Sequence, residues 1–167
     1  MPLGLVGALA CTGCVSPNAA ARPPAPRAPA AAVVPPSARS AALEREVHEL
    51  VNRHRRAHGL APLALDARIS RQARLHSVAM AAGTTRLGHE GFENRVRVLT
   101  ETMPCQRSAE NVASNHGYRA PASEAVRGWL ASRTHRENIE GPYDLTGVGV
   151  ARNAAGEVYF TQLFVGR

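Results

Sequence analysis

The sequence is poor in several features that define common classes of protein. It contains no lysine, its one Trp, three Tyr and three Phe amount to only 4% of 167 residues, and its first apolar run, residues 3–10, is short. A run of 8 residues cannot form the ~20-residue helix that spans a bilayer. Without a dense basic run or a series of aromatic side chains, the net charge of +7 does not indicate a nucleic-acid partner.

The rest of the composition is that of a globular protein. Hydrophobic residues make up 44% and charged residues 20% of the chain, close to the averages for folded domains. The length is near the ~150 residues of a typical domain, so we expect one domain with its own core. All 20 basic residues are arginines, and their excess over 13 acidic residues would favour contact with an anionic cell envelope.

Residues 1–14 resemble an export signal. The apolar run is followed by small residues, as in a signal peptide, although the usual basic start is missing. Thr12, Gly13 and Cys14 resemble the cleavage and lipidation box of bacterial lipoproteins, in which Leu normally stands where this chain has Cys11. We therefore expect a protein located outside the cell or in its envelope, either freely secreted or anchored to the membrane through a lipid on Cys14.

Residues 15–40 form the expected linker. They are rich in Pro, Ala, Arg and Ser, and repeated Pro favours an extended spacer with almost nothing to bury. The domain is expected from residue 41 to residue 167. Because Cys105 is the only cysteine within it, no internal disulfide can form and stability must come from the core.

The domain combines helices with a terminal hairpin. Apolar residues at helical spacing predict helices over residues 41–58, 67–83, 92–99 and 123–131. Asp66 is the expected N-cap of the second helix, and Trp129 is expected in the core. Residues 145–151 and 158–165 are rich in strand formers and flank a turn at 153–156, which predicts a β-hairpin. Helices followed by an antiparallel hairpin indicate an α+β domain.

Several short patterns, in a fixed order, resemble a known family. They are Asn52-x-x-Arg55, Ala73-x-x-His76-Ser77, Gly88-His89, Ala109-Glu110-Asn111-Val112-Ala113, Trp129-x-x-Ser132-x-x-His135-Arg136-x-Asn138-Ile139, Gly147-Val148-Gly149-Val150-Ala151 and Tyr159-x-Thr161-Gln162-x-Phe164. Together they are similar to the CAP superfamily of cysteine-rich secretory proteins, antigen 5 and pathogenesis-related proteins, in its bacterial, disulfide-free form. The resemblance covers residues 43–165. It implies a three-layer α-β-α sandwich, with a small antiparallel sheet between helices, and a protein that is usually exported.

The same resemblance implies a cleft built from two histidines and two acidic residues, sometimes occupied by zinc or another divalent ion. By motif, His89 and His135 match the two histidines and Glu110 matches one acid. The other acid lies three residues after the Trp in the eukaryotic pattern, and that position is Ser132 here. The set is therefore incomplete unless an acid elsewhere in the chain reaches the cleft.

Glu124 or Glu137 could supply that acid. Even without it, two imidazoles and one carboxylate can give a divalent ion three ligands and leave a position for water, whose pKa the ion would lower. However, 20 and 24 residues separate the three matched positions, so spacing alone gives no metal signature. The competing interpretation is that these groups hydrogen-bond one another and pin the sheet to its helices, with Glu110 pairing with an Arg and Asn111 binding loop amides.

Other polar residues also have two interpretations. His54 and His58 lie at i and i+4, as in metal-binding helices, but they continue an apolar stripe, so we expect core-edge packing. His76 is expected to pack on the inner face of its helix. Cys105 follows a Pro near an Arg and could be a reactive thiol with a lowered pKa, although an incidental free thiol is favoured. Ser132 is expected to cap the turn that follows it, since no nucleophile elbow supports a Ser–His catalytic pair.

Two functions remain. We expect a monomeric, surface-displayed binding module without enzymatic activity, whose cleft takes an apolar, lipid or cell-envelope ligand, or a protein. The alternative is a metal-dependent hydrolase that uses the His/Glu cleft. Binding is favoured because acid/base catalysis needs two groups with different proton affinities, and a set lacking one acid supplies them poorly.

Overall fold

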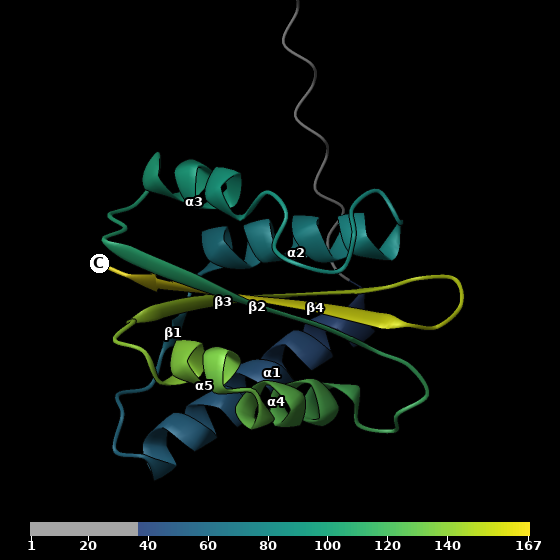
Figure 1. Cartoon of the computed structure of the whole chain (residues 1–167), viewed down its shortest axis with the longest axis horizontal. Coiled ribbons are helices and arrows are strands. Elements are labelled where there is room, and N and C mark those ends of the chain that lie inside the picture. Colours follow the sequence, from purple (N-terminus) through teal and green to yellow (C-terminus); the bar gives the residue numbers. More distant parts are fainter. Residues whose placement is uncertain (1–36) are drawn as a thin grey trace, which may run out of the picture. The chain divides into compact units, whose positions relative to one another are not determined.

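The computed structural model describes residues 37–167. Four strands form one sheet, with helices α2 and α3 on one face and α1, α4 and α5 on the other (Figure 1). This is the three-layer α-β-α arrangement that the family resemblance implies. The expected export segment 1–14, with Cys14, and residues 15–36 of the expected linker lie outside the described residues.

The first two helices follow the predicted apolar stripes. α1 spans Ala38–Ala57 and α2 spans Ala67–Ala81. α1 begins at residue 38 rather than 41, because the side chain of Ser37 accepts a hydrogen bond from an amide of the first turn and acts as the N-cap. Asp66 caps α2 in the same way, as predicted.

Three shorter helices complete the two outer layers: α3 (Phe92–Thr100), α4 (Pro121–Ala131) and α5 (Arg133–Glu140). The sequence did not indicate α5 as a separate helix, because Ile139 is its only buried residue and no apolar stripe marks it. Ser132 stands at its N-cap position, but the expected hydroxyl cap is absent, since the side chain makes no capping hydrogen bond. Among the helices of residues 37–167, none is both long and apolar enough to cross a membrane.

The sheet is mixed and has the strand order β1-β3-β4-β2. Its strands are β1 (Ala64–Leu65), β2 (Arg107–Asn115), β3 (Leu145–Arg152) and β4 (Val158–Gly166). β3 and β4 form the predicted antiparallel hairpin, and β2 pairs antiparallel with β4 along its whole length. The expectation of an antiparallel sheet fails only at β1, which runs parallel to β3 over two residues and is too short to leave a sequence signal.

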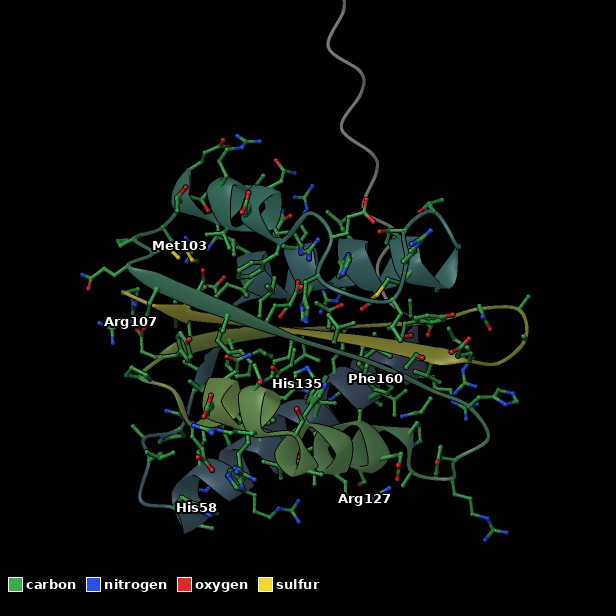
Figure 2. All side chains as sticks on the ribbon, in the orientation of Figure 1. His58, Met103, Arg107, Arg127, His135 and Phe160 are labelled. Atoms are coloured by element: carbon green, nitrogen blue, oxygen red, sulfur yellow. The ribbon has the colours of Figure 1, made fainter. Side chains whose placement is uncertain are left out.

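The core lies on both faces of the sheet. The larger cluster joins the sheet to α1, α4 and α5, and it contains Phe160, which Figure 2 shows beneath the strands. Trp129 belongs to this cluster with 2% of its surface exposed, and its indole Nε1 donates to the Val112 carbonyl at 3.1 Å. The prediction that Trp129 is a core residue is therefore confirmed. A smaller cluster around Ile69 and Leu163 lies under α2 and α3.

α2 packs directly onto β3 because this strand carries glycine at two positions. A Cβ at Gly147 would overlap the backbone of α2 at Ile69, and a Cβ at Gly149 would overlap it at Ala73. Larger side chains here would push the helix away from the sheet. The Gly-x-Gly pattern of β3 thus sets the close approach of the two elements.

A buried carboxylate links the two helix layers to the sheet. Glu44 of α1 accepts hydrogen bonds from Nε and Nη2 of Arg74 in α2, at 2.8 and 2.7 Å. One of its oxygens also accepts from the Val150 amide of β3 at 3.2 Å. Because β1 pairs with β3 only at residues 145 and 146, Glu44 takes the place of a strand for the Val150 amide.

The Asn52-x-x-Arg55 pattern has a structural role. Asn52 exchanges hydrogen bonds with the backbone of Leu63, whose amide donates to Oδ1 at 2.8 Å and whose carbonyl accepts from Nδ2 at 2.9 Å. The buried Arg55 donates from Nη1 to the carbonyls of Ile139 and Gly141, at 2.7 and 2.9 Å. The Arg55 guanidinium therefore holds the end of α5 against α1.

Candidate functional site

Glu110 lies on β2, at the edge of the sheet, on the face covered by α3. Only 1% of its side chain is exposed. Arg95 of α3 donates to both carboxylate oxygens, from Nε to Oε2 and from Nη2 to Oε1, each at 2.9 Å. Nδ1 of His89 donates to Oε1 at 3.0 Å. The buried negative charge is therefore balanced by a guanidinium and held by three N–H groups.

The loop between α2 and α3 places His89. The buried His76 of α2 donates from Nε2 to the carbonyl of Gly88 at 2.7 Å, which fixes the peptide just before His89. Burial lowers the pKa of His76, so its ring is uncharged at neutral pH and keeps one donor for this contact. His76 therefore packs inward, as expected, and also positions the cleft loop. The His89 side chain itself is 53% exposed.

His135 reaches the site from the other helix layer, in the first turn of α5. Asn111 donates from Nδ2 to the His135 carbonyl at 3.0 Å, and Asn138 donates to Asn111 Oδ1 at 2.9 Å. Asn111 follows Glu110 on β2 and faces the opposite side of the sheet, since side chains alternate along a strand. Burial, and to a lesser degree the charge of His89, lowers the pKa of His135, so this imidazole is neutral at pH 7.

The two cleft histidines approach each other around the edge strand. Because β2 ends the sheet, a loop of one layer and a helix of the other can meet beside it, and the rings of His89 and His135 lie 6.5 Å apart between centroids. Two imidazoles on one tetrahedral zinc have ring centres about 5 Å apart, given Zn–N bonds of ~2.0–2.1 Å. An ion shared by both rings would thus require the rings to move closer. For Oε1 of Glu110 to bind the same ion through Nδ1 of His89, their hydrogen bond would have to break. The structure brings His89 to Glu110 and His135 near His89, without forming a ready ligand set.

A cavity of about 550 Å³ opens beside His135, between β2 and α4. Figure 2 shows His135 between the sheet and the lower helix layer. Its walls combine apolar and polar residues, among them Tyr118, Glu124, Gly128, Trp129, Ser132 and His135. Ser132 and His135 therefore face the same space, whereas Glu110 lies outside the lining.

Glu124 and Glu137, the two acids considered for the fourth cleft position, each already form an ion pair with an arginine. Glu124 lines the cavity, but it pairs with Arg127 one turn further along α4. Glu137 pairs with Arg133 on the surface of α5, and its side chain is 57% exposed. Glu124 is thus the acid that reaches the cavity, as a member of an ion pair.

Arg95 is the site residue that sequence analysis did not single out. The interpretation that Glu110 pairs with an Arg is confirmed, but the sequence offers 20 candidates. One signal could have separated Arg95 from the rest. It lies three residues after Phe92 and four before Leu99, on the apolar face of a predicted helix, where an arginine needs a buried partner.

A second group of possible ligands lies away from the cleft. Within residues 37–167, the ligand atoms of His54, His58 and Glu140 all lie within 4.8 Å of one another. Core-edge packing describes His54, whose side chain is 14% exposed, but not His58, which is exposed at the end of α1. The i, i+4 spacing in the sequence indicated the two histidines as possible ligands. Glu140 lies 86 positions after His54, so the sequence could not associate it with them.

Cys105 does not have the environment of a reactive thiol. Burial raises its pKa, and its Sγ lies 3.6 Å from the Arg107 carbonyl rather than against a guanidinium. The interpretation of Cys105 as an activated nucleophile is therefore wrong, and a free thiol without catalytic partners remains.

The three-layer fold, with helices on both faces of one sheet, agrees with a match to a known family. Residues 48–164 match the model of the cysteine-rich secretory protein family, CAP. The chain belongs to this family.

Similar proteins are found in bacteria, and two of those with solved structures are described as an extracellular and an outer surface protein. The uncharacterized protein YkwD of Bacillus subtilis is 31% identical over 134 residues, which cover 75% of this chain and 48% of that protein. An extracellular protein with an SCP domain from Bacillus anthracis has a TM-score of 0.65 at 25% identity, covering 80% of this chain and 45% of that chain. An outer surface protein from Borrelia burgdorferi has a TM-score of 0.65 at 18% identity, covering 75% and 93%. This chain spans about half the length of the first two relatives.

Proposed function

We propose that this CAP domain is a binding module, exported to the cell envelope, whose cleft takes a lipid or another small amphipathic envelope molecule without chemical conversion. The observation that carries the proposal is the cavity of about 550 Å³ beside His135. Its volume lies within the ~300–1,000 Å³ typical of small-molecule sites. Apolar surface comes from Val112, Ala113 and Tyr118. Ser132 and His135 offer polar contacts.

The state of Glu110 argues against acid/base catalysis at this place. Its carboxylate is buried, accepts two hydrogen bonds from Arg95 and one from His89, and does not line the cavity. A group so held would lose three contacts before it could accept a proton from a substrate. Glu110 is therefore not placed to act as an acid or base on a molecule in the cavity.

Gly128 allows a direct test of the cavity. It lines the cavity from α4, and a Cβ added there meets nothing within 4 Å. Gly128→Phe should fill the cavity, whereas the matched Gly128→Ala should leave it open and preserve the fold. Fluorescent single-chain fatty acids and phospholipids serve as probes in an equilibrium titration. We expect binding by the wild type and Gly128→Ala and its loss in Gly128→Phe; equal binding by all three, or by none, would contradict the proposal.

The alternative, metal-dependent hydrolysis, is supported by one observation. His89 and His135 have their rings 6.5 Å apart, and the lowered pKa of His135 leaves its imidazole in the neutral form that binds metals. Zinc titration of the wild type against His89→Ala and His135→Ala tests a cleft ion. Zinc-dependent ester or peptide cleavage that disappears in both variants would replace the binding proposal by this one.

Export and anchoring form the remaining part of the proposal. They rest on residues 1–14 and on relatives described as extracellular or outer surface proteins. If Cys14 carries a lipid, Cys14→Ser should move the protein from the membrane fraction to the soluble fraction, with Cys11→Ser as the matched control. Unchanged fractionation would leave secretion without a lipid anchor.

A further inference from the structure

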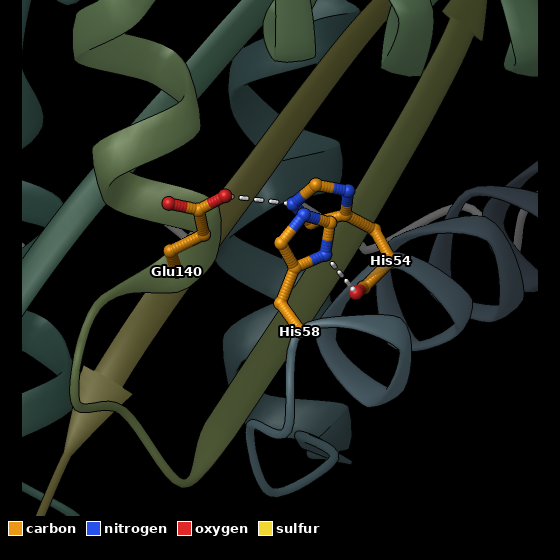
Figure 3. Close-up of side chains that lie close together, drawn as sticks. All are labelled: His54, His58 and Glu140. Carbon is orange, nitrogen blue, oxygen red and sulfur yellow. Dashed lines mark hydrogen bonds and ion pairs between the residues drawn. The ribbon is translucent and has the colours of Figure 1, made fainter.

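The last turn of α1 and the last residue of α5 form a group that the proposed function does not use. Nε2 of His54 lies 2.8 Å from Oε1 of Glu140, and the His54 and His58 rings are stacked with 4.0 Å between centroids (Figure 3). The ligand atoms of the three side chains all lie within 4.8 Å of one another. From this arrangement we infer that His54, His58 and Glu140 bind a divalent transition-metal ion of the zinc type.

The donor set selects this class of ion. Two imidazole nitrogens and one carboxylate oxygen suit zinc and its neighbours, whereas magnesium and calcium prefer ligand sets made of oxygen. Atoms bound to one tetrahedral zinc lie about 3.3 Å apart, given bonds of ~2.0–2.2 Å. The His54–Glu140 contact would therefore open by about 0.5 Å when an ion replaces the shared proton. The exposed His58 ring can move toward the ion.

One hydrogen bond already prepares His58 as a ligand. Its Nδ1 donates to the His54 carbonyl at 2.9 Å, so the proton of the neutral ring is on Nδ1 and the lone pair is on Nε2. A metal-binding histidine commonly has its second nitrogen held by a carbonyl in this way.

Arg55 fixes the distance between the two halves of the group. It lies between the two histidines in sequence, and its Nη1 donates to the carbonyls of Ile139 and Gly141, the neighbours of Glu140, at 2.7 and 2.9 Å. The backbone that carries the carboxylate is thus tied to the helix that carries the imidazoles. A preorganised group of this kind binds an ion at a lower conformational cost than three independent surface side chains.

A bound ion would have two consequences. It would join α1 to α5 through bonds in addition to those of Arg55, and so stabilise the folded state by binding it alone. With three ligands from the protein, the fourth tetrahedral position stays open to water or to a donor atom of another molecule. The cleft residues His89, Glu110 and His135 take no part, so this site and the cleft function can be tested separately.

Zinc binding to the full chain, freed of metal by a chelator, tests the inference. All proteins carry Cys11→Ser, Cys14→Ser and Cys105→Ser, so that thiols do not compete for the ion. In isothermal titration we expect one zinc per chain in the wild-type ligand background. His58→Ala and Glu140→Gln should each weaken binding by at least ~10–100-fold, the loss that even outer-shell partners of a metal cause.

Two control variants and a second readout keep the result specific. His116→Ala removes an exposed histidine elsewhere and His89→Ala removes a cleft histidine; both should retain the site. Zinc should raise the melting temperature of the wild-type background and not that of His58→Ala, whose fold without metal is unchanged because the side chain is exposed. The inference is overturned if no zinc binds, if His58→Ala binds zinc like the wild type, or if binding is lost in His89→Ala instead.

Discussion

The carboxylate of Glu110 depends on one guanidinium for two of its three hydrogen bonds. Arg95 is itself buried, and the pair lies where water cannot replace a lost partner. Removing one member of a buried ion pair leaves an uncompensated charge, which costs far more than removing a surface pair. The Arg95–Glu110 pair therefore links the integrity of the cleft to the stability of the fold.

Arg95→Met tests this dependence. We expect it to lower the free energy of unfolding by about 3–5 kcal/mol, measured by urea denaturation, because a charge stays buried without its partner. Arg97→Met on the same helix is the control, since Arg97 pairs with Glu101 on the surface and should lose less than about 1 kcal/mol. Adding Glu110→Met to Arg95→Met should recover part of the loss. Equal losses of unfolding free energy in Arg95→Met and Arg97→Met would show that the buried pair stabilises the fold no more than the surface pair does.

The buried His76 predicts how stability changes with pH. Burial lowers its pKa in the folded state, so between that value and the ordinary ~6.5 the unfolded chain binds more protons than the folded one. The free energy of unfolding should therefore be full above pH ~6.5 and fall as the pH decreases below it. His135, whose pKa is also lowered, acts in the same direction.

Replacing His76 by Gln separates its share of this effect. Gln has an N–H that can donate to the Gly88 carbonyl but does not titrate, so His76→Gln should reduce the loss of stability between neutral and mildly acidic pH. Urea midpoints measured across that range give the slope. The control His116→Gln changes an exposed histidine and should not alter the slope of the urea midpoint against pH. If His76→Gln has the same slope as the wild type, the buried His76 is not the cause of the pH dependence.

At the scale of the elements, the close contact between α2 and β3 depends on the two glycines of β3, Gly147 and Gly149. Gly149→Ala should destabilise the domain by about 1–3 kcal/mol or more, because its Cβ would overlap the helix backbone at Ala73, which cannot move as a side chain can. Gly128→Ala, in an open position on α4, should be neutral or gain up to about 1 kcal/mol from helix propensity. Thermal unfolding of both variants measures the difference. A tolerated Gly149→Ala would mean that the two elements are not in close contact.

The elements differ in how far the sequence could foresee them. α1, α2 and the β3–β4 hairpin follow from apolar periodicity and turn residues, because each buries one face. β2 was not predicted as a strand, since Glu110, Asn111 and Ser114 are poor strand formers that tertiary partners hold in place. α5 was missed because its residues other than Ile139 make polar contacts rather than an apolar stripe. β2 and α5, which carry Glu110 and His135, are therefore among the elements that the sequence did not predict.

The candidate site likewise combines residues that sequence motifs predict with features that arise only when the layers pack together. His89, Glu110 and His135 were predicted from the motif resemblance, and the structure places His89 against Glu110 and the His135 ring near that of His89. Their partner Arg95 could have been noticed from its place on the apolar face of α3, but only the packing of α3 against β2 pairs it with Glu110. The cavity beside His135 depends on the spacing of β2 and α4, again a property of the assembled layers.

At the scale of the whole molecule, the periodic segments all lie after residue 37. We expect residues 37–167 to fold alone and to unfold cooperatively. A chain starting at Ala41 should fold as well but lose about 1 kcal/mol or more, because it lacks the Ser37 cap and part of the first turn of α1. Urea denaturation of the two chains beside the full chain checks both statements. If residues 37–167 are molten while the full chain is folded, the domain boundary lies earlier.

The position of Glu44 has a consequence for how copies of this domain behave toward one another. A strand with unpaired amides can pair with a strand of another chain and so extend the sheet. On this side of β3, β1 pairs with only its first two residues. The Glu44 carboxylate occupies the Val150 amide, while Arg74 keeps that carboxylate in place. Glu44→Ala should therefore open a docking edge and produce concentration-dependent association in light scattering. On this expectation, the ion pair that joins the helix layers also keeps the Val150 amide from pairing with a strand of another chain.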